Sequence, residues 1–312
     1  MIETVAETRH KEENFLHPEC DLQGWYVAAR SKSLKSGDVR SVDMLHRKIA
    51  LYRGEDGQVR AVDAVCAHLG ANLGHGSVIG NDLECAFHGW RYGTDGICNY
   101  VPHVENPPRR KLRQYPVQEK WGLIWIFNGA KPLWDLPEPD EGLFPLLMPS
   151  VQLGCHPHLM IANGLDGAHF EPLHHMQQTE TPYLTVDEPY EVTLYLCGRS
   201  THPFWRRLTA TRTNDIRAHF KTIGGNMAWV TVEEPVKCYF LFTGQPSPKG
   251  CRSQVVLFLP RSIQAIRAIV TLYLLLQDDN KILSDINFKP GFIETDEGLQ
   301  AFVNIVNNMP TG

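Results

Sequence analysis

Two pairs of cysteine and histidine at fixed spacing carry the clearest chemistry in this sequence. Cys66 and His68 form one pair, Cys85 and His88 form the other, and together they give the pattern C-x-H-x16-C-x2-H. Two thiolates suit one iron of a [2Fe-2S] cluster and two neutral imidazoles suit the other, a ligand set that raises the reduction potential above that of an all-cysteine cluster. The four residues predict a centre that accepts and passes on single electrons.

The alternative for these four residues is structural zinc, because two cysteines and two histidines also suit a tetrahedral zinc site. Zinc fingers usually pair cysteine with cysteine and histidine with histidine, whereas each pair here mixes the two types. Gly70, Gly74, Gly76 and Gly89 lie in or beside the pairs, and their open backbone lets amides approach cluster sulfurs. The mixed pairs favour the cluster.

A second group of metal-binding side chains lies in NGLDGAHFEPLHH, residues 163–175. Asp166, His169 and His174 follow the spacing D-x2-H-x4-H. On a helix Asp166 and His169 share a face, whereas the two histidines converge only if the helix ends or bulges near Pro172. Two imidazoles and one carboxylate on one face of an iron leave the opposite positions open, which suits Fe(II) centres that activate O2.

The carboxylate for such an iron must come from elsewhere in the chain. Asp278 and Asp279 directly follow the most apolar stretch, residues 263–276, and only one of them can face the histidines because adjacent helical residues point about 100° apart. Ile282 and Leu283 stand three and four positions after Asp279 and would pack that turn against a sheet, which favours Asp279. If neither aspartate binds iron, two later acids remain as alternatives: Asp285 and Glu294.

Taken together, CAHLGANLGHG, CAFHGWRY and the N-x2-D-x2-H-x4-H motif resemble the Rieske-type non-haem iron oxygenases, and the resemblance covers nearly all of the chain. It implies the large oxygenase subunit, with a Rieske [2Fe-2S] cluster and a mononuclear Fe(II) bound by three residues: His169, His174 and Asp279. In that family a bridging acid contacts a cluster histidine of the neighbouring subunit in a homotrimer. Asp166 matches that acid and His68 or His88 its partner, while Asn163 would line the site.

The implied activity is the oxidation of a small organic, aromatic or polycyclic substrate by O2. The chain has no G-x-G-x-x-G motif between a strand and a helix, so NAD(P)H electrons would arrive through a separate flavin reductase, with or without a ferredoxin. CxHLGANL together with WYVA is similar to oxygenases of arylamine or steroid-like substrates. N-oxygenation, dealkylation and desaturation reuse the same ligands. Two other classes remain: a Rieske electron-transfer protein without oxygenase activity, and a zinc-binding interaction protein.

The elements that must position the first motif are short strands separated by turns. Residues 49–53 and 59–65 form strand-like runs joined through Gly54, Asp56 and Gly57, and the run WGLIWIFNG at residues 121–129 indicates a buried final strand. We expect a small antiparallel β domain over residues 25–130, the Rieske domain. The proline-rich residues 131–149 predict a linker after it.

Beyond the linker, strand-like runs precede an apolar helix, an order that predicts an α+β domain; these runs are Tyr190–Leu196, Arg217–Thr222, Met227–Val232, Cys238–Phe242 and Ser253–Leu259. The resemblance implies a helix-grip (START-like) catalytic domain of residues 131–312 together with 1–24. In the helix, apolar residues at helical spacing predict the face that packs on the sheet: Ile263, Ile266, Val270 and Tyr273. Several large residues of this domain could fill its core or line a pocket: Met176, Tyr183, Trp205, Phe240 and Phe288.

Composition excludes some classes of function. The formal net charge of −5 over 312 residues argues against a general nucleic-acid binder. The most basic run, residues 109–113, indicates either a solvated loop or a docking patch for an acidic electron donor. The most apolar stretch, residues 263–276, is shorter than a membrane span, and residues 1–20 hold no apolar run of signal-peptide length, so we expect no export signal. Six of the eight cysteines are scattered, which is typical of reduced thiols in a cytoplasmic protein.

Overall fold

The computed structural model describes residues 15–17, 21–187, 189–201, 215–234 and 236–312. The chain folds into two compact units. After the sequence expectations, we call residues 23–135 with 311–312 the Rieske unit, and we call residues 1–22 with 136–310 the catalytic unit. The main segment of the Rieske unit is therefore inserted between two segments of the catalytic unit. Trp205, one of the residues considered for a pocket, lies outside the described residues.

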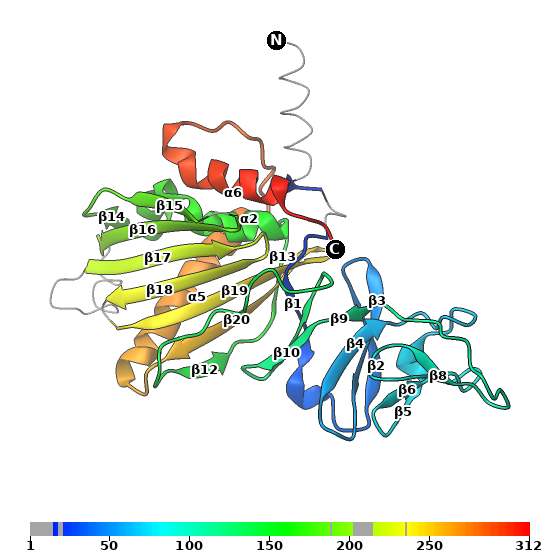
Figure 1. The fold of residues 1–312 in the computed structure, drawn as a ribbon. Helices are drawn as coiled ribbons and strands as arrows, with labels where there is room; N and C mark the ends of the chain where they lie inside the picture. Colours follow the sequence, from blue (N-terminus) through cyan, green and yellow to red (C-terminus); the bar gives the residue numbers. More distant parts are fainter. Residues whose placement is uncertain (1–14, 18–20, 188, 202–214, 235) are drawn as a thin grey trace, which may run out of the picture. The chain divides into compact units, whose positions relative to one another are not determined.

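The Rieske unit consists of three small antiparallel sheets (Figure 1). The first contains β1 (Trp25–Arg30), β11 (Leu123–Phe127) and β10 (Val117–Lys120). The second contains β2 (Val39–Met44), β3 (Arg47–Arg53), β4 (Val59–Asp63) and β9 (Gln114–Tyr115). The third contains β5 (Ser77–Ile79), β6 (Asp82–Glu84), β7 (Arg91–Tyr92) and β8 (Cys98–Tyr100).

The hairpin turn that the sequence predicts at Gly54, Asp56 and Gly57 is present in this unit. β3 and β4 pair as a hairpin, and Gly57 at its turn has a φ of 78°, a left-handed conformation that glycine adopts without steric cost. All five residues of β11 are buried. The strand lies between β1 and β10, and its Ile124 and Ile126 pack in a core with Ile49 and Leu51 of β3. Two short 3-10 helices complete the unit: η1 (Ser31–Ser33) and η2 (Leu73–His75).

The catalytic unit is built on a nine-stranded antiparallel sheet. The main strand order is β12 (Phe144–Leu147), β20 (Gly250–Leu259), β19 (Cys238–Ser247), β18 (Met227–Glu234), β17 (Asp215–Ile223), β16 (Glu191–Ser200) and β14 (Met176–Gln178). β13 (Val151–Leu153) also pairs with β20, and β15 (Tyr183–Asp187) also pairs with β16. Four of the five expected strand runs lie within β17 to β20, and the fifth, Tyr190–Leu196, begins one residue before β16. The α+β fold class is confirmed.

Helices cover this sheet. They are α2 (Pro157–Ala162), α3 (Phe170–His174), α5 (Ile263–Leu283) and α6 (Glu297–Asn308), with the 3-10 helices η3 (Asn163–Leu165), η4 (Gly167–His169) and η5 (Glu294–Asp296). Figure 1 shows α5, in orange, crossing one face of the sheet. Leu272 of α5 packs there with Phe240 of β19 and Leu257 of β20. In the part of the chain that the structure describes, no helix is long and apolar enough to cross a membrane.

The expected contact face of α5 was wrong. Ile266 is 60% exposed, and Val270 and Tyr273 are exposed as well, while the Ile263 side chain lies outside the described part. The face that packs on the sheet is rotated around the helix axis from the expected one. It consists of Ala265, Ala268, Ile269, Leu272 and Leu276. The stretch is apolar at nearly every position, so helical spacing alone selects more than one face.

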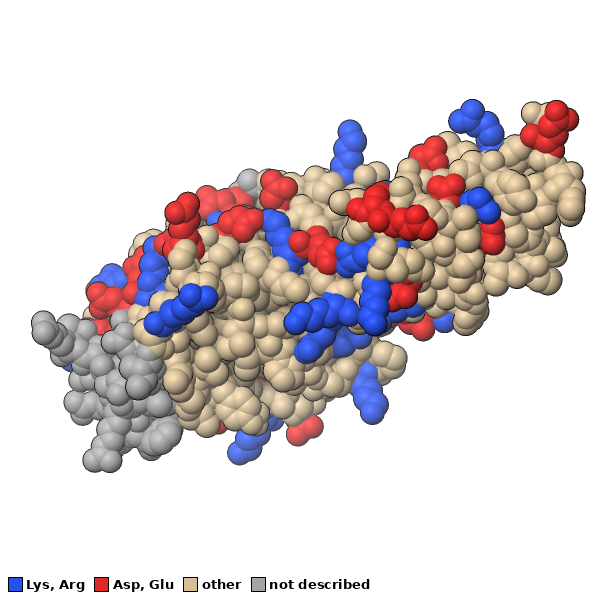
Figure 2. Space-filling model, turned by 90° about the horizontal axis from the view of Figure 1, so that it is seen from below, with Lys and Arg blue, Asp and Glu red and all other residues tan. Residues whose placement is uncertain are grey.

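Charged side chains are mixed on the face of the molecule drawn in Figure 2. Among the residues coloured there, Lys and Arg lie singly or in small groups between Asp and Glu. In the Rieske unit, the basic run is partly occupied by internal contacts: Arg110 Nη1 donates to the Ala67 carbonyl oxygen at 3.1 Å, and Arg113 lies over the Tyr115 ring. Arg109 and Lys111 are exposed.

Candidate metal centres

Two loops of the Rieske unit present the first motif with the same backbone pattern. The Gly70 amide donates to the Cys66 carbonyl at 2.9 Å, and the Gly89 amide donates to the Cys85 carbonyl at 3.0 Å. Both glycines have φ values in the left-handed region, 81° and 65°, which L side chains rarely adopt. Each loop turns back at a glycine four residues after its cysteine, although the histidine stands two positions after Cys66 in one loop and three positions after Cys85 in the other.

The two sulfurs lie in a buried, donor-rich environment. Cys66 and Cys85 are both 3% exposed. Burial raises the pKa of the Cys85 thiol, and the nearby Cys66 sulfur raises it further, whereas the amides of Phe87 and His88 lower it. The Tyr92 hydroxyl lies 3.1 Å from Cys66 Sγ and also accepts the Ala67 amide at 3.0 Å. Donors aimed at sulfur suit thiolates bound to iron.

The two histidines of these loops also lie side by side. The ring centroids of His68 and His88 are 4.7 Å apart, and the His68 ring stacks on Trp90 at 4.4 Å. Nδ1 of His68 is buried without a hydrogen-bond partner among the described residues. Such an unpaired buried nitrogen is uncommon, and it fits an atom that binds a metal. His88 is exposed. Two buried sulfurs, two adjacent imidazoles and an orphaned ring nitrogen fit a [2Fe-2S] cluster with mixed ligands.

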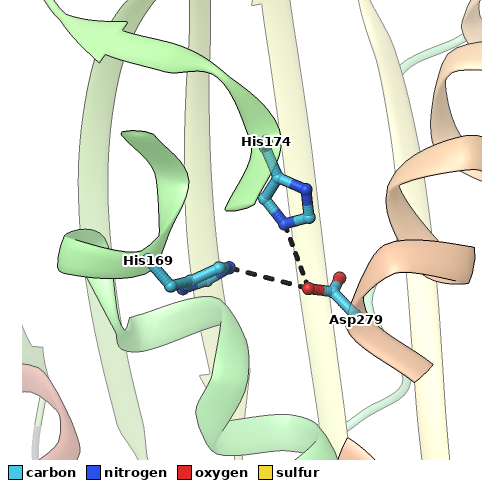
Figure 3. Close-up of side chains that lie close together, drawn as sticks. All are labelled: His169, His174 and Asp279. Atoms are coloured by element: carbon cyan, nitrogen blue, oxygen red, sulfur yellow. Dashed lines mark hydrogen bonds and ion pairs between the residues drawn. The ribbon is translucent and has the colours of Figure 1, made fainter. Parts of the chain in front are cut away.

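In the catalytic unit, the second motif and the C-terminal half of α5 meet. Figure 3 shows His169 and His174 on one side and Asp279 of α5 on the other. His174 Nε2 lies 3.0 Å and His169 Nε2 lies 3.7 Å from the same Asp279 oxygen, Oδ1. One ligand atom from each residue lies within 4.8 Å of the others, a spacing that could hold a metal ion. The two histidines and one carboxylate fit Fe(II).

Local backbone breaks bring the two histidines together. His169 ends η4, His174 ends α3, and His175 follows with a left-handed φ of 53°. The change from 3-10 to α-helix after His169 brings the two rings to a centroid distance of 5.1 Å. The expected irregularity near Pro172 is therefore present: the helix type changes before Phe170, and the helix ends at His174.

Asp166 orients the first histidine. The His169 Nδ1–H donates to the Asp166 backbone carbonyl at 2.6 Å, which leaves Nε2 of the ring facing Asp279. A contact of this type fixes the tautomer of a metal-binding histidine. One oxygen of the Asp166 carboxylate accepts the Ala168 amide at 3.0 Å, and the other lies 3.6 Å from His169 Nδ1. Burial raises the pKa of Asp166, but the His169 ring and the neighbouring amides outweigh it and hold the pKa below its usual value.

Of the two adjacent aspartates on α5, the structure brings Asp279 to the histidines, and Asp278 is not in the group. The reasoning that favoured Asp279 is half correct, because Leu283 is buried but Ile282 is 52% exposed. Leu283, one helical turn after Asp279, is therefore the neighbour that is buried on the side of the helix that carries Asp279.

A cavity of about 280 Å³ lies beside the group, within the catalytic unit, and Asp279 and Asn163 both line it. Most of its other lining residues are apolar, and they come from α2, α5 and strands β13 and β17 to β20; among them are Met160, Phe220, Val230, Phe242 and Leu276. The pocket residues considered from the sequence are not among those that line this cavity: Met176, Tyr183, Phe240 and Phe288. Phe240 packs in the core instead.

Sequence reasoning missed several of the residues that surround these sites. Tyr92 follows His88 by four positions, and only the loop geometry shows that its hydroxyl reaches Cys66. Phe220 contacts Phe170 with a centroid distance of 5.4 Å and so lies close to the histidines. The alternating strand pattern could have indicated which side chains of β17 and β20 face α5, but not that a cavity would separate them from the helix.

Comparisons with known proteins agree with the first motif. Residues 24–116 match the family model described as Rieske [2Fe-2S] domain. The chain carries a Rieske [2Fe-2S] domain. The cholesterol 7-desaturase of Bombyx mori is 42% identical over 123 residues, which is 38% of this chain and 27% of that protein. The probable 3-ketosteroid-9-alpha-monooxygenase oxygenase component of Rhodococcus rhodochrous is 32% identical over 173 residues, or 52% of this chain and 43% of that protein.

Solved structures resemble the whole fold. Dicamba monooxygenase bound to dicamba aligns over 91% of this chain and 96% of its own, with a TM-score of 0.66 and 21% identity. NdmB of Pseudomonas putida CBB5 aligns over 91% and 89%, with a TM-score of 0.69 and 16% identity. Relatives in sequence and neighbours in structure thus confirm the resemblance of this Rieske protein to oxygenase components. The chain spans less than half the length of the two curated relatives named above.

Proposed function

We propose that this Rieske protein is the terminal oxygenase component of a multi-protein system that oxidises a small, aromatic or polycyclic organic substrate with O2. The observation that carries this proposal is the convergence of His169, His174 and Asp279 beside an apolar cavity, in a chain that also carries a Rieske domain. An electron-transfer protein would need neither the cavity nor the second group of ligands. The two relatives named above, a cholesterol 7-desaturase and a probable 3-ketosteroid-9-alpha-monooxygenase component, support a polycyclic substrate.

At the second centre, His169 Nε2, His174 Nε2 and Asp279 Oδ1 would hold Fe(II). When bound, this iron supplies the activation of O2 at the positions that the three residues leave open. Asp166 keeps the His169 ring in the tautomer that presents Nε2. Asn163 lines the cavity next to this centre, where its amide can orient a substrate or a water molecule.

At the first centre, Cys66 and Cys85 would hold one iron of the cluster and His68 and His88 the other. When bound, the cluster supplies one electron at a time. The exposed side of His88 provides a short path for these electrons out of the loops, while the buried cysteines and Trp90 exclude water from the opposite side.

We also propose a homotrimer in which Asp166 of one subunit contacts His88 or His68 of the next. The Asp166 side chain is 31% exposed and anionic, so it can accept a hydrogen bond from a neighbouring subunit. Asp166→Asn should then leave both metal sites occupied and slow single turnover by at least about tenfold. Normal single-turnover rates in that variant would contradict the bridge.

The electron donor in this proposal is a flavin reductase using NAD(P)H, alone or with a ferredoxin, in the cytoplasm. Arg109 and Lys111 are exposed and can attract an acidic partner, whose encounter rate would fall with ionic strength. The relatives include both desaturases and monooxygenases, and both reactions begin with removal of a hydrogen from the substrate. Hydroxylation and desaturation are thus the two reaction types to assay first.

Metal analysis and O2 uptake test the proposal together. The purified protein should contain roughly three irons and two acid-labile sulfides per chain, and it should consume O2 with a chemical reductant only when a polycyclic substrate is present. Two irons per chain without substrate-dependent O2 uptake would identify an electron-transfer protein instead. Zinc without iron would identify an interaction protein.

A further inference from the structure

The cavity beside Asp279 differs from an ordinary core defect in its length and in one buried polar side chain. We propose that it binds an uncharged, elongated substrate and that Ser253 of β20 hydrogen-bonds the hydroxyl or carbonyl group at the end far from the metal centre. This inference rests on the proposed function, because only an enzyme has a substrate. The binding itself can be measured without turnover.

The cavity lining disfavours ionised ligands, because it offers them almost no charged partner. Among the described lining residues there is no Lys, Arg or His, and the one acid is Asp279, whose Oδ1 faces the two histidines. A carboxylate or ammonium group in this cavity would lose its hydration without gaining a partner of opposite charge, which costs several kcal/mol or more. A neutral ligand avoids that cost and gains from burial against the apolar lining.

The length of the cavity follows from the strands that line it. Phe220 on β17 lines the cavity at the end near the metal centre. Its ring contacts Phe170 and lies so close to Gly164 that a Cβ atom there would meet it. Ser253 is on β20, and β18 and β19 lie between these two strands. Neighbouring strands are about 4.8 Å apart, so Ser253 lies roughly 14 Å from the strand of Phe220. A compact ligand would leave most of this length empty.

Ser253 is the polar residue that stands out at the far end. It shares its strand face with Val255 and Leu257, since side chains alternate along β20, and these two residues pack against α5. Ser253 is only 4% exposed, it lines the cavity, and its hydroxyl makes no hydrogen bond with the residues that the structure describes. Most buried hydroxyls are paired, and Ser253 differs from a serine such as Ser200 in that it lines the cavity. A ligand oxygen would supply the missing partner.

The other polar lining residues do not fit this role. Asn163 and Asp279 belong to the end near the metal centre, while Tyr273 and Gln277 of α5 are exposed and can be hydrated by solvent. Asn280 is half-buried on the same helix. A buried serine among apolar side chains therefore sets which end of an elongated ligand points away from the metal.

The test compares two variants of equal volume at this position. Ser253→Thr keeps the hydroxyl and Ser253→Val replaces it with a methyl group, so the pair differs in one hydrogen-bonding group. Ser200→Ala serves as a control, because Ser200 is another buried serine of the sheet, its hydroxyl has no partner among the described residues, and it does not line the cavity. The probes share one steroid skeleton: androstane, androstan-3-ol and the sulfate ester of that alcohol.

Dissociation constants are measured by calorimetry on the full-length iron-loaded protein without reductant. We expect androstan-3-ol to bind about fivefold more weakly to Ser253→Val than to Ser253→Thr, androstane to bind both variants equally, and Ser200→Ala to behave as wild type. The sulfate ester should bind wild type at least about tenfold more weakly than the alcohol.

Several outcomes would overturn the inference. Equal binding of the alcohol by the Thr and Val variants would remove the role of Ser253, and tight binding of the sulfate would refute the exclusion of charge. Absence of binding by every probe would refute the substrate class. None of these results touches the oxygenase proposal, which is contradicted separately if wild type takes up no O2 with any polycyclic compound and a reductant.

Discussion

The two proposed metal centres differ in how far apart their residues lie along the chain. All four residues of the Rieske loops lie within residues 66–88, and each loop is closed by backbone hydrogen bonds of its own. In the catalytic unit, His174 and Asp279 are 105 positions apart. Asp279 reaches the histidines only because α5 packs across the sheet formed by β12 to β20.

This difference determines what each centre depends on. The geometry of the Rieske loops is set by local turns with two left-handed glycines. The geometry at Asp279 depends on the packing of a whole helix, so a mutation far from the metal can displace its ligand. The following predictions test that contrast, beginning with the largest expected effect.

Removing the distant carboxylate should empty one centre and leave the other intact. Asp279→Ala is expected to lose roughly one of three irons per chain, because two histidines alone bind Fe(II) weakly, and with it all substrate oxidation. The visible spectrum of the Rieske cluster should not change. Asp278→Ala is the matched control and should keep its iron; iron analysis with EPR distinguishes the two, and the reverse pattern would assign the ligand to Asp278.

Changing a ligand in the local centre should alter only that centre. His88→Cys gives three thiolates and one imidazole, and the potential of the cluster should fall by several hundred millivolts toward the value of roughly −400 mV typical of plant-type clusters. Spectroelectrochemistry measures this shift. The iron held near Asp279 should remain at full occupancy, and loss of both metals would refute the independence of the two centres.

Weakening the packing of α5 should affect the distant centre without touching a ligand. Leu272 is 8% exposed in the core between α5 and the sheet, and Leu272→Ala should destabilise the catalytic unit by about 2–5 kcal/mol. Ile266→Ala, on the exposed side of the same helix, should change stability by less than about 0.5 kcal/mol. Denaturant unfolding followed by far-UV circular dichroism measures both; equal effects would contradict the observed helix face.

Lowering the pH should reduce the stability of the catalytic unit before that of the Rieske unit. Burial lowers the pKa of His156 to about 4 and that of His158 to about 3, and His158 Nδ1 is hydrogen-bonded to the Phe15 carbonyl. Because unfolded histidines have a pKa near 6.5, the unfolded chain takes up protons that the folded chain does not, and stability falls as the pH drops from about 6.5 toward 4. The loss should be on the order of 1 kcal/mol per histidine by pH 5.5.

Thermal unfolding between pH 7.5 and 5 checks this sign. A His158→Phe variant should lose part of the pH dependence over this window, whereas a variant of the exposed His103 should keep it. If stability rises as the pH falls, the two histidines are not held neutral in the folded protein.

The part of this architecture that sequence predicts well is the part set by local chemistry. The Rieske loops, the strands β16 to β20 and the α+β class all follow from motif spacing, turn residues and alternation. The choice of Asp279 also agrees with the geometry, although one of its two supporting residues, Ile282, is exposed.

What could not be predicted depends on packing between distant elements. Apolar residues lie on more than one side of α5, so the sequence did not distinguish Ile266 from Ile269 as the residue that faces the sheet. The hydroxyl of Tyr92 reaches Cys66 only through the folding of the loops. Ser253 is one of several serines in the sequence, and its burial in a cavity is a property of the sheet and the helix together.

The 105 positions between His174 and Asp279 also set a schedule for metal loading during synthesis. Ribosomes add about 5–20 residues per second, so the histidine pair waits roughly 5–20 s for its carboxylate, and longer until α5 has packed. The four residues of the Rieske loops are complete well before either histidine of the second centre is made. With the proposed ligands, a nascent chain would be able to acquire its cluster early, whereas mononuclear iron would be retained only by a finished catalytic unit.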